Sequence, residues 1–433
     1  MWNTRIGNGA HDAVRTSSEG VTLVSSYLEP VIRAVLLIYV AVLPFKALLI
    51  VERNGFLVLL GLLLIWCLTN GRLFYRKTPY DVALLAFVLW VGFTVPFSIF
   101  PGYSVKEYGR LLQWMVVLYA TLFFFGTPPY RRMLVSVIGM ASFVAVFFGL
   151  TQLNVATPQL VVGTFPAEVW FTTFLVMVIP FGLVAALGDT PPLARRLGAL
   201  LALVGAVCLI DTQSRAGLVA LLGELLAMAW MIRTKRAKLL MGILTGLLIT
   251  AIVAGTYMKM GVPLSSYSGF QGSIPVKTDA ASIVHRFDIW RFTLSEIAKH
   301  WLVGIGFGGD AYLHVYGHEG ETVEPGHTRV KEQGTHNIFL YLSLHVGIIG
   351  MVLFVWFYLS VIRNTLKEYW TAGDWTARTV LGGAVVSMIG LFVRLQFDQM
   401  FVGTLATLFW VLLAVAIMHY PSWDRATSES RPG

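Results

Sequence analysis

The chain has 433 residues, of which 56% are hydrophobic and only 13% are charged. Soluble domains carry roughly 25% charged residues, so this composition and a mean hydropathy of +0.72 exclude an ordinary water-soluble protein. The net charge of +9 does not indicate nucleic-acid binding, because most basic residues sit in short turns between apolar runs, where they report membrane topology. Cys67 and Cys208 lie inside apolar runs and are expected to be buried thiols.

Long apolar runs recur along the chain, many of them near the ~20 residues that cross a bilayer as a helix. They predict an all-α polytopic membrane protein with about twelve transmembrane helices and one large periplasmic loop domain. The runs at 31–46, 197–210 and 379–394 are short, and one of them could be re-entrant. The expected spans are 31–46, 54–70, 80–98, 107–125, 132–152, 166–187, 197–210, 216–232, 238–256, 337–362, 379–394 and 400–418.

The charge of the connecting turns alternates along the chain, and the more basic side of a membrane protein is normally cytoplasmic. The basic set contains Arg72, Arg76, Lys77, Arg131, Arg132, Arg195, Arg196, Arg233, Lys235, Arg236, Lys238, Arg363, Lys367 and Arg378. The sparse set contains Lys46, Arg53, Lys106, Arg215 and Arg394. The sparse side is therefore expected to face the periplasm, with both termini in the cytoplasm.

Three regions follow from this reading: an N-terminal bundle over 1–256, a periplasmic loop domain over 257–336, and C-terminal membrane helices with a short tail over 337–433. The loop domain is polar and long, and loops of this length are usually functional. It holds six of the nine histidines, namely His285, His300, His314, His318, His327 and His336.

Residues 281–301 of the loop are predicted to form a helix that lies at the membrane interface. Apolar side chains recur there at spacings of three and four and form one stripe, and Arg286 and Arg291 flank that stripe on opposite sides. Such a helix would hold its guanidinium groups near the lipid headgroups. Gly304, Gly306, Gly308 and Gly309 then predict a flexible turn.

Arg215 is the first candidate for chemistry, since it lies between two apolar runs on the side that is poor in basic residues. Ser214 is expected to cap the following helix. A helix N-terminus and a planar guanidinium both suit a phosphate group. The alternative is an arginine that only contacts lipid headgroups.

Arg286, Arg291 and His336 are further candidates. A diphosphate carries about two negative charges and needs more than one cation, which either arginine could supply, although both could instead contact anionic lipids. His336 stands where the polar loop enters a membrane helix. Its imidazole can take a proton from a sugar hydroxyl, but position alone fits a packing role equally well.

Three weaker patterns complete the candidates. Arg394 and Asp398 occupy the last short periplasmic turn, where they could border a pocket or form only a local ion pair. Arg110, beside Lys106 and Glu107, carries a similar suggestion. A zinc site is also conceivable, with ligands from His314, His318, His327, Glu319, Glu321 and Glu324. The glycines and prolines nearby make the helix that such a site needs doubtful, so no metal is expected.

Three motifs in a fixed order resemble the O-antigen ligase and polymerase family. They are Gln213-Ser214-Arg215-Ala216-Gly217 at the start of a span, Arg286–Trp290 followed by Leu302-Val303-Gly304-Ile305-Gly306, and His336-Asn337-Ile338-Phe339 at the start of another. The resemblance covers roughly residues 200–360, around the large loop.

The resemblance implies about twelve helices in the bacterial inner membrane and a glycosyl transfer that needs neither metal nor cofactor. The donor would be a glycan on undecaprenyl diphosphate, and the acceptor a sugar hydroxyl of lipid A-core in lipopolysaccharide. Arg215 and Arg286 would hold the diphosphate, with Arg291 as a further contact, and His336 would act on the acceptor. Mechanism and resemblance together imply inversion at the anomeric carbon.

Other functions remain open on sequence grounds. An O-antigen polymerase would use the same donor with a glycan acceptor, and a protein O-glycosylating ligase would use a protein. A transporter or lipid flippase belongs to a different class, which often shows paired repeats and ionisable residues in mid-membrane. No clear repeat is visible, and Glu224 is the clearest ionisable residue inside a span. No pattern in the sequence indicates the oligomeric state.

Overall fold

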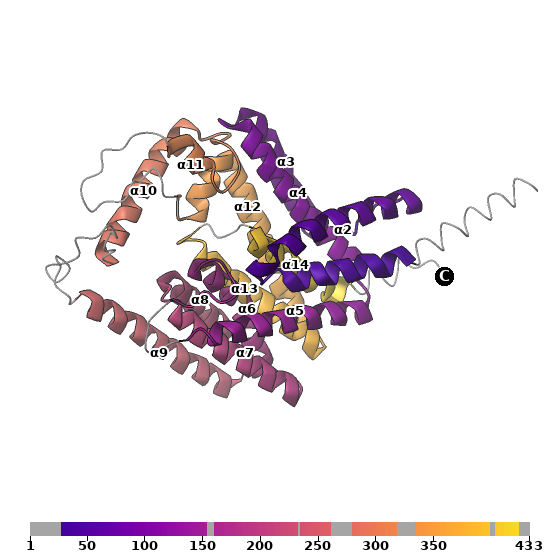
Figure 1. The fold of residues 1–433 in the computed structure, drawn as a ribbon. Coiled ribbons are helices and arrows are strands. Elements are labelled where there is room, and N and C mark those ends of the chain that lie inside the picture. The colour runs from indigo at the N-terminus through magenta and orange to yellow at the C-terminus, as the bar shows by residue number, and fades with distance from the viewer. Residues whose placement is uncertain are drawn as a thin grey trace, which may run out of the picture.

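The computed structural model describes residues 27–153, 160–232, 234–260, 279–317, 334–398 and 403–423. All regular secondary structure in these ranges is helical (Figure 1). A first helix covers 27–42. The labelled helices are η1 (Lys46–Leu48), α2 (Leu49–Asn70), α3 (Asp81–Thr94), η2 (Val95–Phe97), α4 (Pro101–Phe124), α5 (Pro128–Leu150), α6 (Glu168–Leu187), α7 (Pro192–Asp211), α8 (Arg215–Met231), α9 (Lys235–Met260), α10 (Asp279–Lys299), α11 (Ala311–Tyr316), α12 (Ile338–Thr371), α13 (Trp375–Arg394) and α14 (Gly403–Met418).

The helices agree with the expected membrane architecture, since each of the predicted spans overlaps a helix. Within the described residues, six helical segments are long and apolar enough to cross a membrane: Lys46–Asn70, Pro128–Leu150, Glu168–Leu187, Pro192–Asp211, Ile338–Thr371 and Trp375–Arg394. The chain is therefore a polytopic membrane protein, and the total of twelve crossings stays a prediction. Two of the three short runs, those at α7 and α13, belong to this long apolar set.

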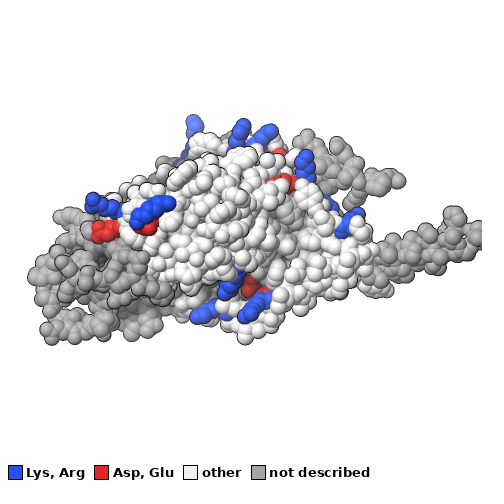
Figure 2. All heavy atoms as spheres, turned by 90° about the horizontal axis from the view of Figure 1, so that it is seen from above, with Lys and Arg blue, Asp and Glu red and all other residues white. Residues whose placement is uncertain are grey.

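The surface of the described residues also fits a surrounding bilayer. Large apolar side chains are widely exposed; Leu68 is 83% exposed and Val82 is 73% exposed. Lys and Arg side chains lie toward the margins, and a broad area of uncharged residues separates them (Figure 2). Water would disfavour so much apolar surface, whereas lipid tails would cover it.

Helix α6 lies at the centre of the bundle and packs against α7 and α13. At the contact between α6 and α7, a Cβ atom on Gly182 would lie 2.7 Å from the carbonyl oxygen of Gly198. Such small residues let membrane helices approach closely. Helix α8 packs on the other side of α13, and α12 packs on α3 and α13. This arrangement brings the start of α8 toward the end of α13.

Helix α12 is broken at Gly347, whose φ of 74° and ψ of 171° are not helical. A break leaves carbonyl and N–H groups without their helical partners, and groups from outside the helix satisfy them here. A Cβ atom on Gly347 would lie 1.8 Å from the carbonyl oxygen of Leu302, so the two backbones are in direct contact. The bonds at the break are Ile305 N to Leu344 O (2.8 Å), Gly306 N to His345 O (3.1 Å), Trp90 Nε1 to Val346 O (2.8 Å) and Ile348 N to Trp301 O (2.9 Å).

The turn at residues 304–308 differs from the expected flexible turn. These residues are buried, and the main chain of 305–306 is bonded to α12. Gly304, Gly306 and Gly308 have φ values of 74°, 128° and 137°, which only glycine adopts readily. The glycines therefore allow a tight backbone contact that fixes the segment after α10 onto the broken helix.

Helix α10 confirms the predicted helix at 281–301. Within its predicted apolar stripe, Phe287, Leu294 and Trp301 are exposed, as an interfacial helix requires, whereas Ile297 is buried. Ile289, which lies outside that stripe, is also buried, and α10 packs against α12. The described helix begins at Asp279, and residues 261–278 and 318–333 of the expected loop domain lie outside the described residues.

Candidate functional site

Arg215 is the first residue of α8, and the turn before it is held in place from both sides. Gln213 has a φ of 53°, and the Oγ atom of Ser214 accepts a hydrogen bond of 3.2 Å from the N–H of Gly217. This contact confirms the predicted N-cap. The Oγ1 atom of Thr172 in α6 donates to that of Thr212 at 3.1 Å. These contacts fix the backbone at Arg215, whose side chain is exposed.

Arg286 lies on the packed side of α10. It is half-buried, one turn before Trp290, whose indole N–H donates to the carbonyl oxygen of Thr335 at 3.2 Å. Thr293, on the same side of the helix, is fully buried. Arg291 is exposed, because five residues at ~100° each turn it ~140° away from Arg286.

The segment that carries His336 is attached to the end of α13. The side-chain oxygen of Asn337 caps α12 by accepting hydrogen bonds from the N–H groups of Phe339 (2.9 Å) and Leu340 (3.2 Å). Its amide nitrogen donates to the carbonyl oxygen of Gln396 at 3.2 Å. The N–H of Ile338 donates to the carbonyl oxygen of Leu395 at 2.9 Å. His336 has a φ of 48°, a conformation uncommon for a residue with a side chain and often found at functional sites.

Asp398 joins His336 to Arg394. Its Oδ1 atom lies 3.7 Å from Nδ1 of His336, and its Oδ2 atom lies 3.5 Å from Nη2 of Arg394. Arg394 is only 1% exposed, so its charge needs a nearby carboxylate. Both distances exceed an ordinary hydrogen bond.

The charged groups around Asp398 interact with one another electrostatically. Burial by itself raises the pKa of Asp398, but the polar contact with His336 and the charges of Arg394, His336 and Arg286 outweigh it and hold the pKa below its ordinary value. Burial lowers the pKa of Arg286, the charge of Asp398 opposes this effect, and the charge of Arg215 adds to it. Arg215, Arg286, His336, Arg394 and Asp398 thus lie close enough to influence one another, and we call them the Asp398 cluster.

The sequence candidates therefore separate into three places. Five of them form the Asp398 cluster. Arg291 is exposed on α10. Arg110 lies on α4, where its Nη1 atom pairs with Oε1 of Glu107 at 2.6 Å.

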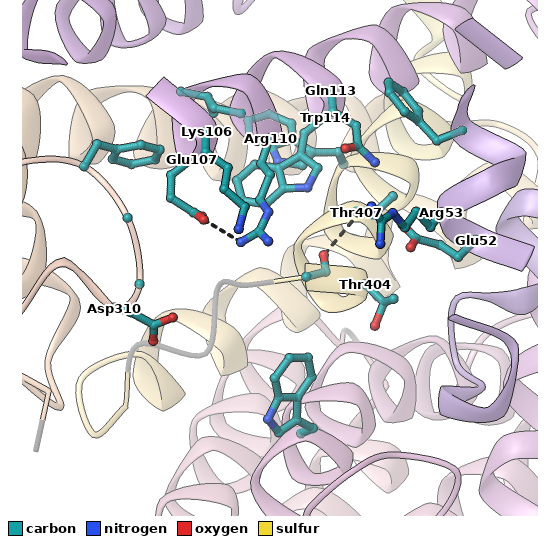
Figure 3. Close-up of a pocket in the computed structure, with 18 of the residues that line it drawn as sticks. Glu52, Arg53, Lys106, Glu107, Arg110, Gln113, Trp114, Asp310, Thr404 and Thr407 are labelled. Carbon is teal, nitrogen blue, oxygen red and sulfur yellow. Dashed lines mark hydrogen bonds and ion pairs between the residues drawn. The ribbon is translucent and has the colours of Figure 1, made fainter. Parts of the chain in front are cut away.

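A large cavity next to the Asp398 cluster was not anticipated from sequence. It has a volume of about 900 Å³ and lies between α2, α4, α14, the start of α12 and residues 307–310. Arg53, Lys106, Arg110, Trp114 and Thr404 are among the side chains around it (Figure 3). Ile338, two residues after His336, is part of its wall. No sequence pattern joins segments so far apart, so only the packing reveals it.

The described residues contain no group of three or more His, Cys, Asp and Glu side chains that could hold a metal ion. Of the residues considered for a zinc site, only His314 is described, and its ring lies 4.7 Å from that of Tyr103. The others, His318, Glu319, Glu321, Glu324 and His327, fall outside the described residues. The groups that the structure does bring together are guanidinium, imidazole and carboxylate, which can bind phosphate and move a proton.

Part of the chain is similar to a known family of proteins. Residues 197–355 match the family model described as O-Antigen ligase. A Rickettsia bellii protein named "Putative polysaccharide ligase" is 25% identical over 185 residues, which are 42% of this chain and 41% of that protein. A Rickettsia felis protein of the same name is 30% identical over 98 residues, 22% of this chain and 24% of the relative. The matches thus span less than half of either relative. The family match includes Arg215 and His336.

Proposed function

We propose that this chain, whose residues 197–355 match the family model described as O-Antigen ligase, transfers a glycan from undecaprenyl diphosphate to a sugar hydroxyl of lipid A-core. The reaction takes place at the periplasmic face of the bacterial inner membrane. The observation that carries this proposal is the Asp398 cluster, because it unites three arginines, a histidine and a carboxylate from four separate segments of the chain.

The donor diphosphate binds between Arg215 and Arg286. These two guanidinium groups act on each other electrostatically, and an anion placed between them relieves that repulsion. Arginine binds phosphate through two parallel N–H donors, and Arg215 also stands at the N-terminus of α8, where the backbone favours an anion. Arg394 is already paired with Asp398 and is therefore structural.

His336 acts as the base toward the acceptor. Its Nδ1 atom faces Asp398, so the other ring nitrogen, Nε2, points away from the carboxylate and toward substrate. Nε2 takes the proton of the acceptor hydroxyl while the hydroxyl oxygen bonds to the anomeric carbon. The bond from that carbon to the diphosphate breaks, and its electron pair stays on the leaving phosphate oxygen. Asp398 stabilises the imidazolium until it releases its proton.

The two arginines supply the charge stabilisation that the leaving group needs. Negative charge grows on the diphosphate oxygen as the bond breaks, and fixed cations aimed at that oxygen are typically among the larger catalytic contributions. The reaction is thus expected to proceed without a metal ion and to invert the anomeric carbon. A chelator should leave the rate unchanged; a loss of activity restored by divalent ions would contradict this part of the proposal.

The test is complementation of a deletion strain with Arg215→Ala, Arg286→Ala and His336→Ala. Each variant should insert at wild-type levels and leave lipid A-core unmodified. Arg196→Ala is the matched control, since Arg196 is an exposed arginine at the start of α7, away from the cluster. Normal lipopolysaccharide from the three cluster variants would overturn the site.

Lipid analysis of the deletion strain itself tests the acceptor. A ligase predicts long glycans that accumulate on the undecaprenyl carrier beside unmodified core. Single repeat units on the core would instead identify a polymerase, and normal glycan on core with unglycosylated protein would identify a protein-modifying enzyme.

A further inference from the structure

The cations of the sparsely basic side gather in two places. Sequence assigns Lys46, Arg53, Lys106, Arg215 and Arg394 to that side. Arg215 and Arg394 belong to the Asp398 cluster, and the other three line the 900 Å³ cavity together with Arg110. Basic residues are disfavoured on the periplasmic side of a membrane protein, so their concentration in one cavity requires a reason of its own.

Within the described parts of the chain, three of these four cations form no ion pair. Arg110 is paired with Glu107 at 2.6 Å. Among the residues that the structure describes, no salt bridge joins Lys46, Arg53 or Lys106 to an acidic side chain. Arg53 and Lys106 come from opposite walls, α2 and α4 (Figure 3). Glu52, Glu107 and Asp310 also line the cavity, so its four basic side chains exceed its three acidic ones by one. The cavity therefore keeps a net positive charge toward a ligand.

The remaining walls suit the body of a glycolipid. Trp114, Trp170 and Trp410 line the cavity and offer flat aromatic faces to sugar rings. Phe56 and Leu57 add apolar surface on α2. A volume of about 900 Å³ lies at the upper end of small-molecule sites, large enough for several sugars.

The cavity and the Asp398 cluster are neighbours that share no lining residue. None of the five cluster residues lines the cavity, yet Ile338 does, and it follows His336 by two residues. Two anion-binding sites therefore lie on either side of the segment that carries His336, the proposed base. A transfer between two substrates needs this arrangement, with the donor diphosphate on one side of His336 and the acceptor on the other.

We propose that the cavity holds the acceptor glycolipid through an anionic group on its saccharide, a phosphate or a carboxylate, bound by Arg53 and Lys106 with Lys46 beside them. This inference rests on the proposed function and identifies the second substrate's site. The same cations would also attract phosphate headgroups of the bilayer, so the experiment must separate these two sources of phosphate.

The experiment compares the full-length wild type with the double variant Arg53→Gln/Lys106→Gln in nanodiscs of neutral phosphatidylcholine. Initial rates are measured with lipid A-core varied at saturating donor, and with donor varied at saturating lipid A-core. The double variant should raise KM for lipid A-core about tenfold and leave kcat and KM for the donor unchanged. Lys77→Gln/Arg196→Gln is the control, because it removes one exposed lysine and one exposed arginine away from the cavity.

Three results would overturn the inference: a raised KM for the donor, no change in either KM, or a defect that appears only in anionic phosphatidylglycerol nanodiscs. Direct binding of purified lipid A-core keeps the test separate from the proposed reaction. If the wild type transfers no glycan, the proposed function fails, while binding about tenfold tighter than that of the double variant still supports the cavity assignment. Equal binding by both proteins would refute it.

Discussion

Asp398 is buried among positive charges, and it is the residue through which His336 and Arg394 meet. Sequence reasoning treated Asp398 as the partner of Arg394 alone, because the two are one helical turn apart. The contact with His336 depends on two hydrogen bonds to the end of α13, one from the side chain of Asn337 and one from the main chain of Ile338. No periodicity encodes contacts between segments so distant in the chain, so this pairing could not be predicted.

We expect Asp398→Asn to lower kcat by roughly 10²-fold, because the amide no longer stabilises the imidazolium of His336. Transfer rates at saturating substrates measure this effect, and Asp398→Glu should restore part of the rate. An Asp398→Asn enzyme with the wild-type kcat would remove Asp398 from the mechanism.

The lowered pKa of Asp398 predicts how the stability of the folded protein changes with pH. Its pKa is lower in the folded protein than its ordinary value, so the ionised carboxylate stabilises the fold above about pH 4. That contribution is lost as the pH falls through the folded pKa. Thermal unfolding of the wild type should show this loss and Asp398→Asn should lack it; identical pH profiles would contradict the expectation.

Arg286 and Arg291 lie on different sides of α10, so a comparison of their variants shows which arginine binds the donor diphosphate. Both flank the expected stripe in sequence, but α10 packs with Arg286 toward Asp398 and leaves Arg291 exposed. Arg286→Ala should therefore raise KM for the donor at least tenfold, whereas Arg291→Ala should change it less than twofold. Donor-dependent initial rates decide the matter, and equal defects would mean that both arginines reach the diphosphate.

At the scale of elements, the break in α12 and the glycine turn after α10 form one structural unit. A continuous apolar run predicted a membrane helix from residue 337 onward, and that prediction is confirmed. The run contains two glycines, Gly347 and Gly350, and nothing in its pattern marks Gly347 as the break. Only the carbonyl of Leu302, in contact with Gly347, explains why the helix is interrupted there.

Gly347→Ala should destabilise the protein strongly, by more than about 3 kcal/mol. Its φ of 74° disfavours any side chain, and the new Cβ atom would collide with Leu302. Gly139→Ala is the matched control, because Gly139 lies within α5 with no atom within 4 Å of an added Cβ, so it should be neutral or slightly stabilising. Size-exclusion chromatography after heating measures both; equal thermal stabilities would refute the strained break.

At the scale of the molecule, the apolar runs located the helices well because ~20 apolar residues bounded by charged turns have few alternatives to a membrane span. Ser214 was also identified, since a helix cap is a local property of sequence. The cavity between α2, α4 and α14 escaped prediction, because its walls depend on how helices from both ends of the chain pack.

The orientation inferred from the basic turns predicts which residues face each compartment. In a variant with Cys67 and Cys208 replaced, Lys77→Cys should react with a membrane-impermeant maleimide only after the cytoplasmic side is opened. Ala298→Cys, at an exposed position of α10, should react in intact spheroplasts. The reverse pattern would place the Asp398 cluster in the cytoplasm and exclude the proposed reaction.

The break at Gly347 also divides α12 into two parts that have different contacts. Residues 348–371 form the longer part of an apolar segment that is long enough to cross a membrane, whereas 338–346 are bonded to the turn after α10 and to the end of α13. Because hydrogen bonds hold residues 338–346 to α13 and to the turn after α10, we expect a tilt of residues 348–371 in a thicker or thinner lipid layer to leave His336 in place. Lipids with different acyl-chain lengths should therefore alter how the protein sits in the membrane while its turnover stays constant.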